Sequence, residues 1–584
     1  MNRIHRHCRA TLLRATGRGS LAVALVILSV ASARASEEEL RAEVHTLMER
    51  LRKLEGKLDK AEKSAAADKK KAKEEKQKEK EAKEKEKEKK EQAEKIGPDK
   101  FRFRGLTITP GGFLALESVW RSRWIGADIN TPFQNIPYNF FATGHSSEFR
   151  FSARPSRLSM LIKGDVDPLT NIFAYVETDF LGAAQTANSN QSNSYNLRLR
   201  QAYTNIDWDV FGAHFMAGQA WSLVTLNKIG IKPDTTVQPL TIDHQYVPGY
   251  TWARQPGLRL TMDFYKKFWL SLAAEGAATT FTGYGALPPG FFGTTTLPLQ
   301  NPILFGQAAG GGLFNIVNSY SLNRAPDLIA KAAWDLDLGD RTVHVEGFGL
   351  MRNFTTRAYW GNRNAWGGGF GAGIYAPVIP DVLDFQVSGA IGHGIGRYGA
   401  AQLADATWSA FDGGPLPINE RMILVGGVLH PTPDWDIYAY AGGEFTQRNP
   451  QYVAIPGNVV FGGFANPFFN NLGCNIENDQ LLAVPAGQPV FLPGGTAANI
   501  PLGGRFGCAG LIKDVRQVTG GVWHTLYQGQ FGKVRGGVQY SYTIKDGFFG
   551  VGGAPQARDS MVFTSFRYYP FEGKAPTAPV LANY

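Results

Sequence analysis

The sequence has few cysteines, few charged residues and no long hydrophobic run. Only 3 of its 584 residues are cysteine, and 19% are charged. No segment reaches the ~18 consecutive apolar residues that a transmembrane helix needs. The motifs HExxH, GxSxG and GxxxxGK[ST] are absent, and the ten histidines are scattered. The sequence therefore predicts neither an enzyme nor a site for a metal or another cofactor.

The charges are concentrated near the N-terminus. Residues 1–35 hold six Arg and no acidic residue, and residues 36–95 hold 20 Lys and Arg against 18 Asp and Glu. This leaves 35 basic and 33 acidic residues in 96–584. Because nucleic-acid binding requires a basic excess on a folded surface, we expect no nucleic-acid partner.

Residues 1–35 have the layout of a secretory signal peptide. Arginines precede an apolar run of 11 residues, Leu21 to Ala31, and Ala33-Arg34-Ala35 is a small-x-small cleavage site. The alternative is an uncleaved signal anchor, although 11 apolar residues are too few to span a bilayer.

Cleavage after Ala35 removes Cys8 and leaves two cysteines, Cys474 and Cys508, in one irregular segment. In an exported chain such a pair predicts one disulfide. A metal or redox pair is the alternative, but no CxxC motif or nearby histidine supports it.

Residues 36–67 contain a heptad repeat. Apolar residues recur at alternating spacings of four and three, at Leu40, Val44, Leu47, Leu51, Leu54 and Leu58. This pattern predicts an α-helical coiled coil, and the alternative is an amphipathic helix packed on its own chain. Residues 68–95 are nearly all Lys, Glu and Ala, so they form a charged spacer that cannot bury a core.

From residue 112 onward, Gly-rich segments of about ten residues alternate apolar and polar side chains. Strands of ~9–11 residues suit a tilted crossing of a bilayer. Sixteen candidates lie at about 112–121, 157–164, 171–180, 195–206, 210–219, 256–264, 267–275, 327–337, 342–352, 366–376, 382–392, 421–430, 435–446, 515–527, 531–545 and 558–569.

Long and short connections alternate between these segments, and the first connection is long. Outer-membrane barrels have short periplasmic turns and long external loops, and they are closed because no strand edge can be left unpaired in hydrocarbon. We therefore predict that 96–584 form an all-β transmembrane barrel of about 16 antiparallel strands. It would sit in the outer-membrane lipid of a Gram-negative bacterium, with the N-terminal extension in the periplasm. The alternatives are fourteen or eighteen strands, or a soluble all-β protein.

Aromatic residues near the strand ends fit the girdles that flank the apolar belt of such barrels. The candidates are Trp120, Trp124, Trp208, Trp221, Trp435 and Tyr568.

Charged residues repeat on one face of several early strands, and we expect this face to line the channel. The candidate lining residues are Arg150, Arg154, Arg157, Lys163, Glu177, Asp179, Arg198 and Arg200. Arginine suits transient capture of carboxylate or phosphate, and a cationic pore favours anions. In the alternative interpretation the arginines brace the wall by pairing with Glu177 and Asp179. The long connection 276–326 could fold inward to narrow the channel or cap it from outside.

Five short motifs and the heptad segment carry a resemblance to a known family. The motifs are Ser156-Arg157-Leu158, Leu197-Arg198-Leu199-Arg200-Gln201-Ala202-Tyr203, Gly218-Gln219-Ala220-Trp221-Ser222, Arg324-Ala325-Pro326-Asp327-Leu328 and Phe563-Thr564-Ser565-Phe566-Arg567-Tyr568-Tyr569. Over most of 36–571 the chain resembles the DcaP-like porins, trimeric outer-membrane channels with a periplasmic coiled-coil extension. The resemblance implies a sixteen-stranded homotrimer that passes small anions, particularly dicarboxylates, along Arg157, Arg198 and Arg200.

The chain departs from that family in two places. Phe571 would be the terminal aromatic residue read by the barrel-assembly machinery, yet thirteen residues follow it. The Lys/Glu spacer is also unusually long. Both departures concern assembly and reach through the envelope rather than the pore.

The sequence thus predicts an outer-membrane porin for passive diffusion of small hydrophilic solutes, favouring anions such as dicarboxylates. One alternative is a non-selective general porin. The other is an envelope-tethering protein that is anchored by its barrel and contacts peptidoglycan or periplasmic proteins through 36–95.

Overall fold

The computed structural model describes residues 100–182, 194–282, 303–307, 320–358, 361–409, 411–455, 458–477 and 508–573, together with Thr46, Met48, Glu49 and Lys53. The chain divides into two compact units, Met1–Ile96 and Gly97–Tyr584. The four described residues of the first unit are helical. The signal peptide, the charged spacer and the rest of the predicted coiled coil lie outside the described residues, so these three assignments stay predictions. Within the described part, no helix has the length and hydropathy needed to cross a bilayer.

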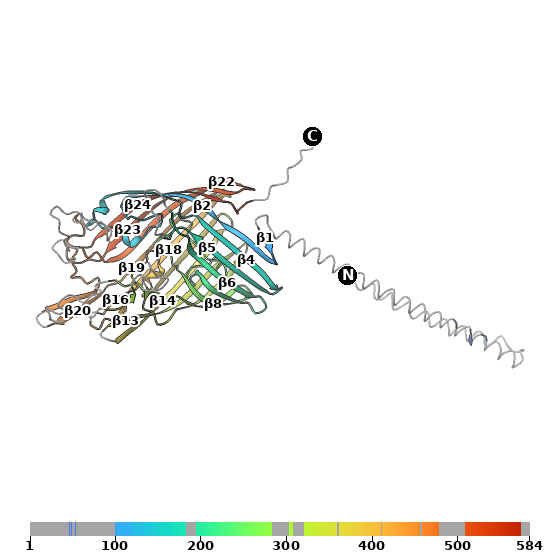
Figure 1. Cartoon of the computed structure of the whole chain (residues 1–584), viewed down its shortest axis with the longest axis horizontal. Coiled ribbons are helices and arrows are strands. Elements are labelled where there is room, and N and C mark those ends of the chain that lie inside the picture. The colour runs from blue at the N-terminus through green and yellow to red at the C-terminus, as the bar shows by residue number, and fades with distance from the viewer. Residues whose placement is uncertain are drawn as a thin grey trace, which may run out of the picture. The chain divides into compact units, whose positions relative to one another are not determined.

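The second unit is a closed antiparallel barrel (Figure 1). Its sixteen wall strands are β2 (Leu106–Arg121), β4 (Arg157–Asp167), β5 (Thr170–Asp179), β6 (Arg198–Trp208), β7 (Ala213–Trp221), β8 (Arg254–Phe264), β9 (Phe268–Glu275), β12 (Asp327–Leu338), β13 (Arg341–Ala358), β14 (Gly361–Ile379), β15 (Leu383–His393), β18 (Asn419–Thr432), β19 (Trp435–Thr446), β22 (Ile512–Gly529), β23 (Gly532–Gly547) and β24 (Gln556–Tyr569). Pairing of β24 with β2 closes the ring. The predicted sixteen-stranded barrel is confirmed.

Shorter elements complete this unit. The strand β1 (Phe101–Phe103) pairs with the start of β2. The strand β3 (Glu148–Ser152) pairs with the end of β2, beyond the part that pairs with β4. Three hairpins lie in the long loops: β10 (Gly306–Gln307) with β11 (Tyr320–Ser321), β16 (Ala406–Trp408) with β17 (Pro415–Pro417), and β20 (Asn449–Ile455) with β21 (Asn458–Phe464). The 3-10 turns are η1 (Phe133–Asn135), η2 (Ala142–His145) and η3 (Gly396–Tyr398).

The strand boundaries differ most from the prediction in the hairpin β13–β14. The alternation predicted strands of 342–352 and 366–376, but the pairing continues to Ala358 and Gly361. In this outer part polar residues face each other, such as Thr355 opposite Asn364. Loop 394–418 covers this part of the hairpin, where Thr356 donates to the Gly413 carbonyl, and Phe354, Thr355 and Thr356 are all buried, so no apolar–polar alternation marks the continuation.

The two faces of the wall have opposite character. On β8, Leu258 and Leu260 are 55% and 50% exposed, whereas Arg259 and Thr261 are 3% and 2% exposed. The apolar side chains therefore point away from the barrel, and the polar ones point into it. This arrangement is typical of a strand with lipid on one side and water on the other.

Only some of the predicted girdle aromatics lie on the outer face. Trp120 and Trp435 are 40% exposed and point outward, but Trp221 is 2% exposed and lies inside the barrel. There it contacts the rings of Tyr246 and Trp252. The girdle assignment of Trp221 is therefore wrong, because a loop folds over it.

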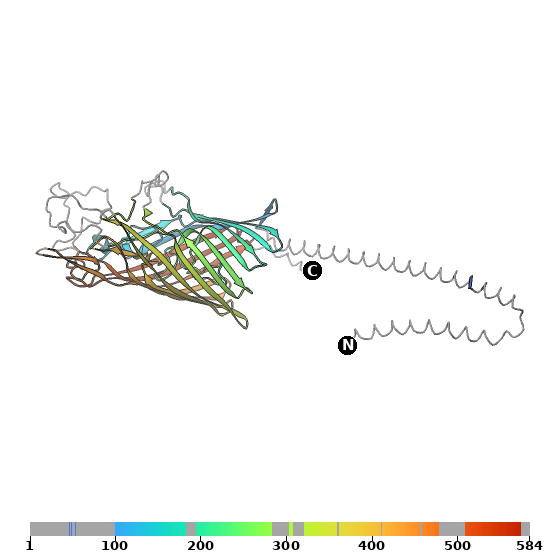
Figure 2. The same ribbon diagram turned by 90° about the horizontal axis from the view of Figure 1, so that it is seen from below.

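Short turns and long loops occupy opposite ends of the barrel, and the tilt of the strands between them is visible in Figure 2. We call these the turn end and the loop end. The main buried apolar cluster lies inside the lumen and is built mostly by loop residues, including Ile129, Phe133 and Ile242. The predicted disulfide between Cys474 and Cys508 is present in the connection between β19 and β22.

Candidate functional site

The loop 222–253, which joins β7 to β8, enters the lumen. Its base is closed by a hydrogen bond from the Ser222 amide to the Ala253 carbonyl (2.8 Å). Its first half is held by Lys331 of β12, whose Nζ donates to the Thr225 carbonyl (2.7 Å) and to Asn227 Oδ1 (3.1 Å). Because that ammonium group is fully buried, these contacts fix the loop against this wall.

The middle of the loop reaches the far wall. The Leu240 amide donates to the Tyr440 hydroxyl of β19 (3.2 Å), and Trp523 Nε1 of β22 donates to the Leu240 carbonyl (3.0 Å). The Ile242 amide donates to Gln539 Oε1 of β23 (2.6 Å). Loop 222–253 therefore crosses the lumen from one wall to the other and divides it.

The described parts of the connection 276–326 behave differently. The Thr280 amide donates to Asp405 Oδ2 (2.9 Å), and the Phe281 ring stacks on Trp408 at 5.2 Å between centroids. Both partners belong to another loop, 394–418. Among the described residues, 222–253 is the loop that crosses the lumen, whereas the described parts of 276–326 contact loop 394–418.

Four of the predicted lining residues form one ion-pair cluster on β5 and β6. Arg200 Nε lies 2.6 Å from Glu177 Oε1, and its Nη1 lies 2.8 Å from Asp179 Oδ2. Arg198 Nη2 is 2.7 Å from the same Asp179 oxygen. A β-bulge between Glu177 and Thr178 skips Arg200 in the strand register, which lets two arginines of one strand reach a single carboxylate.

The neighbouring strand adds a third arginine to this cluster. Arg157 Nη1 of β4 lies 3.4 Å from Glu177 Oε2, while its Nε is buried without a hydrogen-bond partner. The side chains differ in access, because that of Arg198 is 37% exposed and that of Arg200 is 2% exposed. Arg198 is thus both anchored and open to the lumen.

Two residues outside the predicted lining set, Glu117 and Arg567, extend the cluster. Arg567 Nη2 of β24 lies 2.6 Å from Glu117 Oε1 of β2. Glu117 is a lone acidic residue within an apolar strand, which is a sequence signal for a buried partner.

The tip of loop 222–253 faces these groups. His244 Nδ1 lies 3.8 Å from Glu117 Oε2. Burial lowers the pKa of His244 well below its usual value, and the nearby Arg567, Arg157 and Arg200 lower it further. His244 is therefore neutral, and the loop tip adds no positive charge to the arginines.

The other three predicted lining residues lie elsewhere. Arg154 pins three segments together: its Nε donates to the Phe180 carbonyl (3.1 Å), its Nη1 to Asp128 (2.8 Å) and its Nη2 to the Leu181 carbonyl (2.9 Å). Lys163 Nζ lies 5.7 Å from the Phe173 ring centroid. Arg150 lines a cavity at the loop end.

One cavity lies at the loop end of the barrel, and another lies beside loop 222–253. The cavity at the loop end has a volume of about 830 Å³ and is lined by Arg150, Tyr138 and Lys545, among others. A second cavity of about 450 Å³ lies between the loop and β14, β15, β18 and β19, with Asp234 and Asp384 in its lining.

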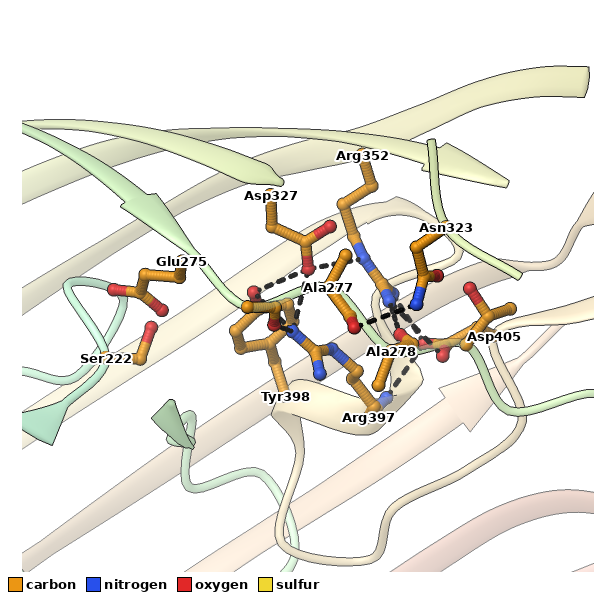
Figure 3. Close-up of polar contacts among 12 residues, drawn as sticks. Ser222, Glu275, Ala277, Ala278, Asn323, Asp327, Arg352, Arg397, Tyr398 and Asp405 are labelled. Carbon is orange, nitrogen blue, oxygen red and sulfur yellow. Dashed lines mark hydrogen bonds and ion pairs between the residues drawn. The ribbon is translucent and has the colours of Figure 1, made fainter. Parts of the chain in front are cut away.

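A second buried ion cluster holds the loops at the loop end (Figure 3). Arg352 of β13 lies 3.1 Å from Asp327 and 2.7 Å from Asp405, and Arg397 lies 2.8 Å from Asp327. The hydroxyl of Tyr398 also donates to Asp327 (2.8 Å). These contacts join loop 394–418 to the wall, and Arg352 further donates to the Ala278 carbonyl of the connection 276–326.

Among the described residues, no group of three or more His, Cys, Asp or Glu side chains is placed to hold a metal ion.

Comparisons with known proteins show a similar fold in solved structures. No family model matches the chain, and no curated protein matches it. The chain is similar to the outer membrane channel DcaP of Acinetobacter baumannii, with a TM-score of 0.53 and 16% identity over 80% of this chain and 99% of that chain. This confirms the resemblance at the level of the fold.

Two further solved structures are more distant. The OmpF of Salmonella typhi in complex with daunomycin has a TM-score of 0.41, and the anion-selective porin from Comamonas acidovorans has a TM-score of 0.39. Each is 9% identical over 80% of this chain and 99% of the other chain, which is too distant to support an argument.

Proposed function

We propose that this chain is an outer-membrane porin through which small hydrophilic solutes diffuse passively, with a preference for anions such as dicarboxylates. A sixteen-stranded barrel with an apolar outer face and polar inner face, similar in fold to DcaP, supports the channel role. Single-chain barrels with an even number of strands are typical of the Gram-negative outer membrane.

The anion preference is carried by one observation, which is the local excess of arginine opposite the loop tip. Arg157, Arg198, Arg200 and Arg567 share only three carboxylates, those of Glu117, Glu177 and Asp179. The fork of Arg198 is open to the lumen and can hold a carboxylate of a small anion, and the buried fork of Arg200 adds positive charge behind it. Because each fork already has a protein partner, capture stays weak enough for release.

The reversal potential in a planar bilayer under a salt gradient tests this preference. We expect the wild-type channel to favour the anion, and Arg198→Ser to reduce that preference. The double variant with Arg200→Ser should favour the cation, because it leaves Glu177 and Asp179 without their main partners. Arg341→Ser, at the turn end, is the matched control.

An unchanged reversal potential in the double variant would support the general porin instead. Single-channel recording with monocarboxylates, dicarboxylates and phosphate then ranks the solutes. Heat-dependent migration on gels shows that each variant has folded into a barrel.

We further propose that three copies assemble and that the extension 36–95 lies in the periplasm. The heptad at 40–58 supports association of parallel helices, since apolar a and d positions form the seam of a coiled coil. Native mass spectrometry in detergent should give a trimer. Deletion of 36–95 tests the tethering alternative, because a tether would lose envelope integrity while the purified barrel still conducts.

A further inference from the structure

The outer wall of the barrel carries an apolar groove that the transport function does not use. It has a volume of about 830 Å³ and runs over β14, β15, β18 and the end of β19. Its shape follows from the strand register. One row of outward residues is large, with Phe370 beside Ile391, whereas the next row places Ala372 beside Gly389. The small pair leaves a hollow below the large pair.

The rims of this groove are apolar and open. Phe370 is 74% exposed, Ile391 is 58% exposed and Ile423 is 53% exposed. In a membrane barrel, such outward side chains contact the hydrocarbon of the lipids. A hollow between them is therefore a place for an acyl chain.

Arg421 stands at the loop end of the groove. It follows the first residue of β18, Asn419, by two positions and pairs in the register with Ile391 and Phe445. Its side chain points outward and is exposed, and within the described residues it makes no hydrogen bond or ion pair. An arginine near the membrane surface costs little free energy, whereas one at the midplane costs ~2–4 kcal/mol.

The strand next to β19 adds basic residues to this part of the outer wall. Arg516 on β22 pairs with both nearby carboxylates, Asp514 and Asp546. Lys513 on β22 is exposed at the same end, and Arg558 is exposed on β24, two strands further round the barrel. Arg516 thus already neutralises the carboxylates of Asp514 and Asp546. The positive charge of Arg421 has no such partner among the described residues, so it can bind an external anion.

We infer that this groove binds a phosphorylated glycolipid of the outer leaflet, of the lipopolysaccharide type. One acyl chain lies in the hollow at Ala372 and Gly389, and a phosphate of the headgroup binds Arg421. The planar fork of arginine bonds two oxygens of one phosphate, and its aliphatic stem can lie along apolar surface. This inference rests on the outer-membrane location in the proposed function.

Binding of fluorescent deep-rough lipopolysaccharide to the full chain in detergent tests the inference. Arg421→Gln should weaken binding about fivefold, as expected for one basic residue at a lipid surface. Ala372→Trp fills the hollow and should weaken binding at least as much. The matched controls are Ala330→Trp, an outward alanine of β12, and Lys266→Gln in a turn, and both should bind like the wild type. Dephosphorylated lipopolysaccharide should bind the wild type about as weakly as the intact lipid binds Arg421→Gln.

Three results would overturn the inference. The first is unchanged binding in both groove variants. The second is equally tight binding of phosphatidylglycerol, which would assign the site to phospholipid. The third is an Ala372→Trp variant that binds the lipid as tightly as the wild type but forms a smaller oligomer, which would show that the groove is a contact between copies of the chain. Single-channel conductance of the same samples tests the porin function separately. A channel that conducts but does not bind the lipid would contradict only the lipid site, whereas a protein that does not conduct would contradict the porin function.

Discussion

The tip of loop 222–253 carries two neighbouring titratable residues whose responses to pH should oppose each other. Burial raises the pKa of Asp243 to about 6, although its carboxylate accepts from the Thr131 and Gln245 amides. Burial together with nearby arginines lowers the pKa of His244 well below its usual value. Both shifts exist only while the loop is docked across the lumen.

The signs follow from which state binds more protons. The docked loop holds the Asp243 proton more tightly than a free loop, so this contribution to docking is complete below pH ~3.9 and is lost as the pH rises through 6. A free loop protonates His244 below pH ~6.5 while the docked loop does not, so that contribution to docking is lost as the pH falls. Each effect changes the docking free energy by ~1.4 kcal/mol per pH unit.

Between pH ~4 and ~6 the two contributions cancel, so docking of the wild-type loop should be nearly independent of pH. His244→Gln leaves only the effect of Asp243, and its docking should strengthen by ~2 kcal/mol as the pH falls from 6 to 4. Asp243→Asn leaves only the effect of His244, and its docking should weaken over the same range.

Hydrogen exchange of the Ile242 amide measures docking directly. This amide donates to Gln539 on the far wall, so it is protected only while the loop crosses the lumen. After correction for the intrinsic rate, exchange should be flat for the wild type. It should slow on acidification in His244→Gln and accelerate in Asp243→Asn. Peptides from β23 are the internal control. The same pH slope in all three proteins would refute the assignment of these opposing shifts.

Three other variants probe how the loops are held. Lys331→Met leaves Glu346 buried without its cation, which should destabilise docking by ~3–5 kcal/mol and appear as faster exchange of 225–230. Arg352→Met leaves Asp327 and Asp405 short of a partner, and protease cleavage in 276–282 should increase while the barrel stays folded. Cys508→Ser should make the β19–β22 connection easier to cleave by protease, since its 34-residue cross-link contributes ~3–4 kcal/mol on the chain-entropy model, and conductance should not change.

The wall of the barrel could be predicted because the membrane imposes the pattern that sequence reading detects. Lipid outside and water inside force each strand to alternate, as in β8, where Leu258 and Leu260 face out and Arg259 faces in. The extension of β13 and β14 was missed because loop 394–418 covers that part of the hairpin, so that Phe354 and Thr355 are both buried and the alternation is lost. There, Thr355 pairs with Asn364 across the two strands.

The arginine cluster could be predicted only in part. Spacing placed Arg198 and Arg200 on one face, and in the structure both reach Asp179. Spacing carried no information about the bulge that brings both arginines to Asp179, because a bulge depends on the register between strands. The partnership of Glu117 with Arg567 joins residues 450 positions apart, so only closure of the barrel could reveal it.

The crossing loop was harder to foresee, because burial of a loop is decided by the shape of the cavity that it enters. Sixteen strands enclose a lumen too wide for wall side chains to fill. Loop 222–253 places Leu240 and Ile242 in the lumen, where they pack in the same apolar cluster as Trp523 and Tyr440. The loop has no periodic pattern, so its apolar residues, such as Leu240 and Ile242, were the only sequence feature that could indicate its burial.

The crossing of the lumen by loop 222–253 also explains how a barrel with little net charge could prefer one kind of ion. Residues 96–584 carry only two more basic than acidic residues, so the barrel as a whole exerts little selection. Screening in physiological salt reduces the effect of a charge beyond ~8 Å, and an ion in the centre of an undivided lumen would be little affected by the wall. By dividing the lumen, loop 222–253 reduces the distance between a passing solute and Arg198. Selectivity in the proposed porin therefore depends on docking of the loop, so variants that release it should lose anion preference even with every arginine retained.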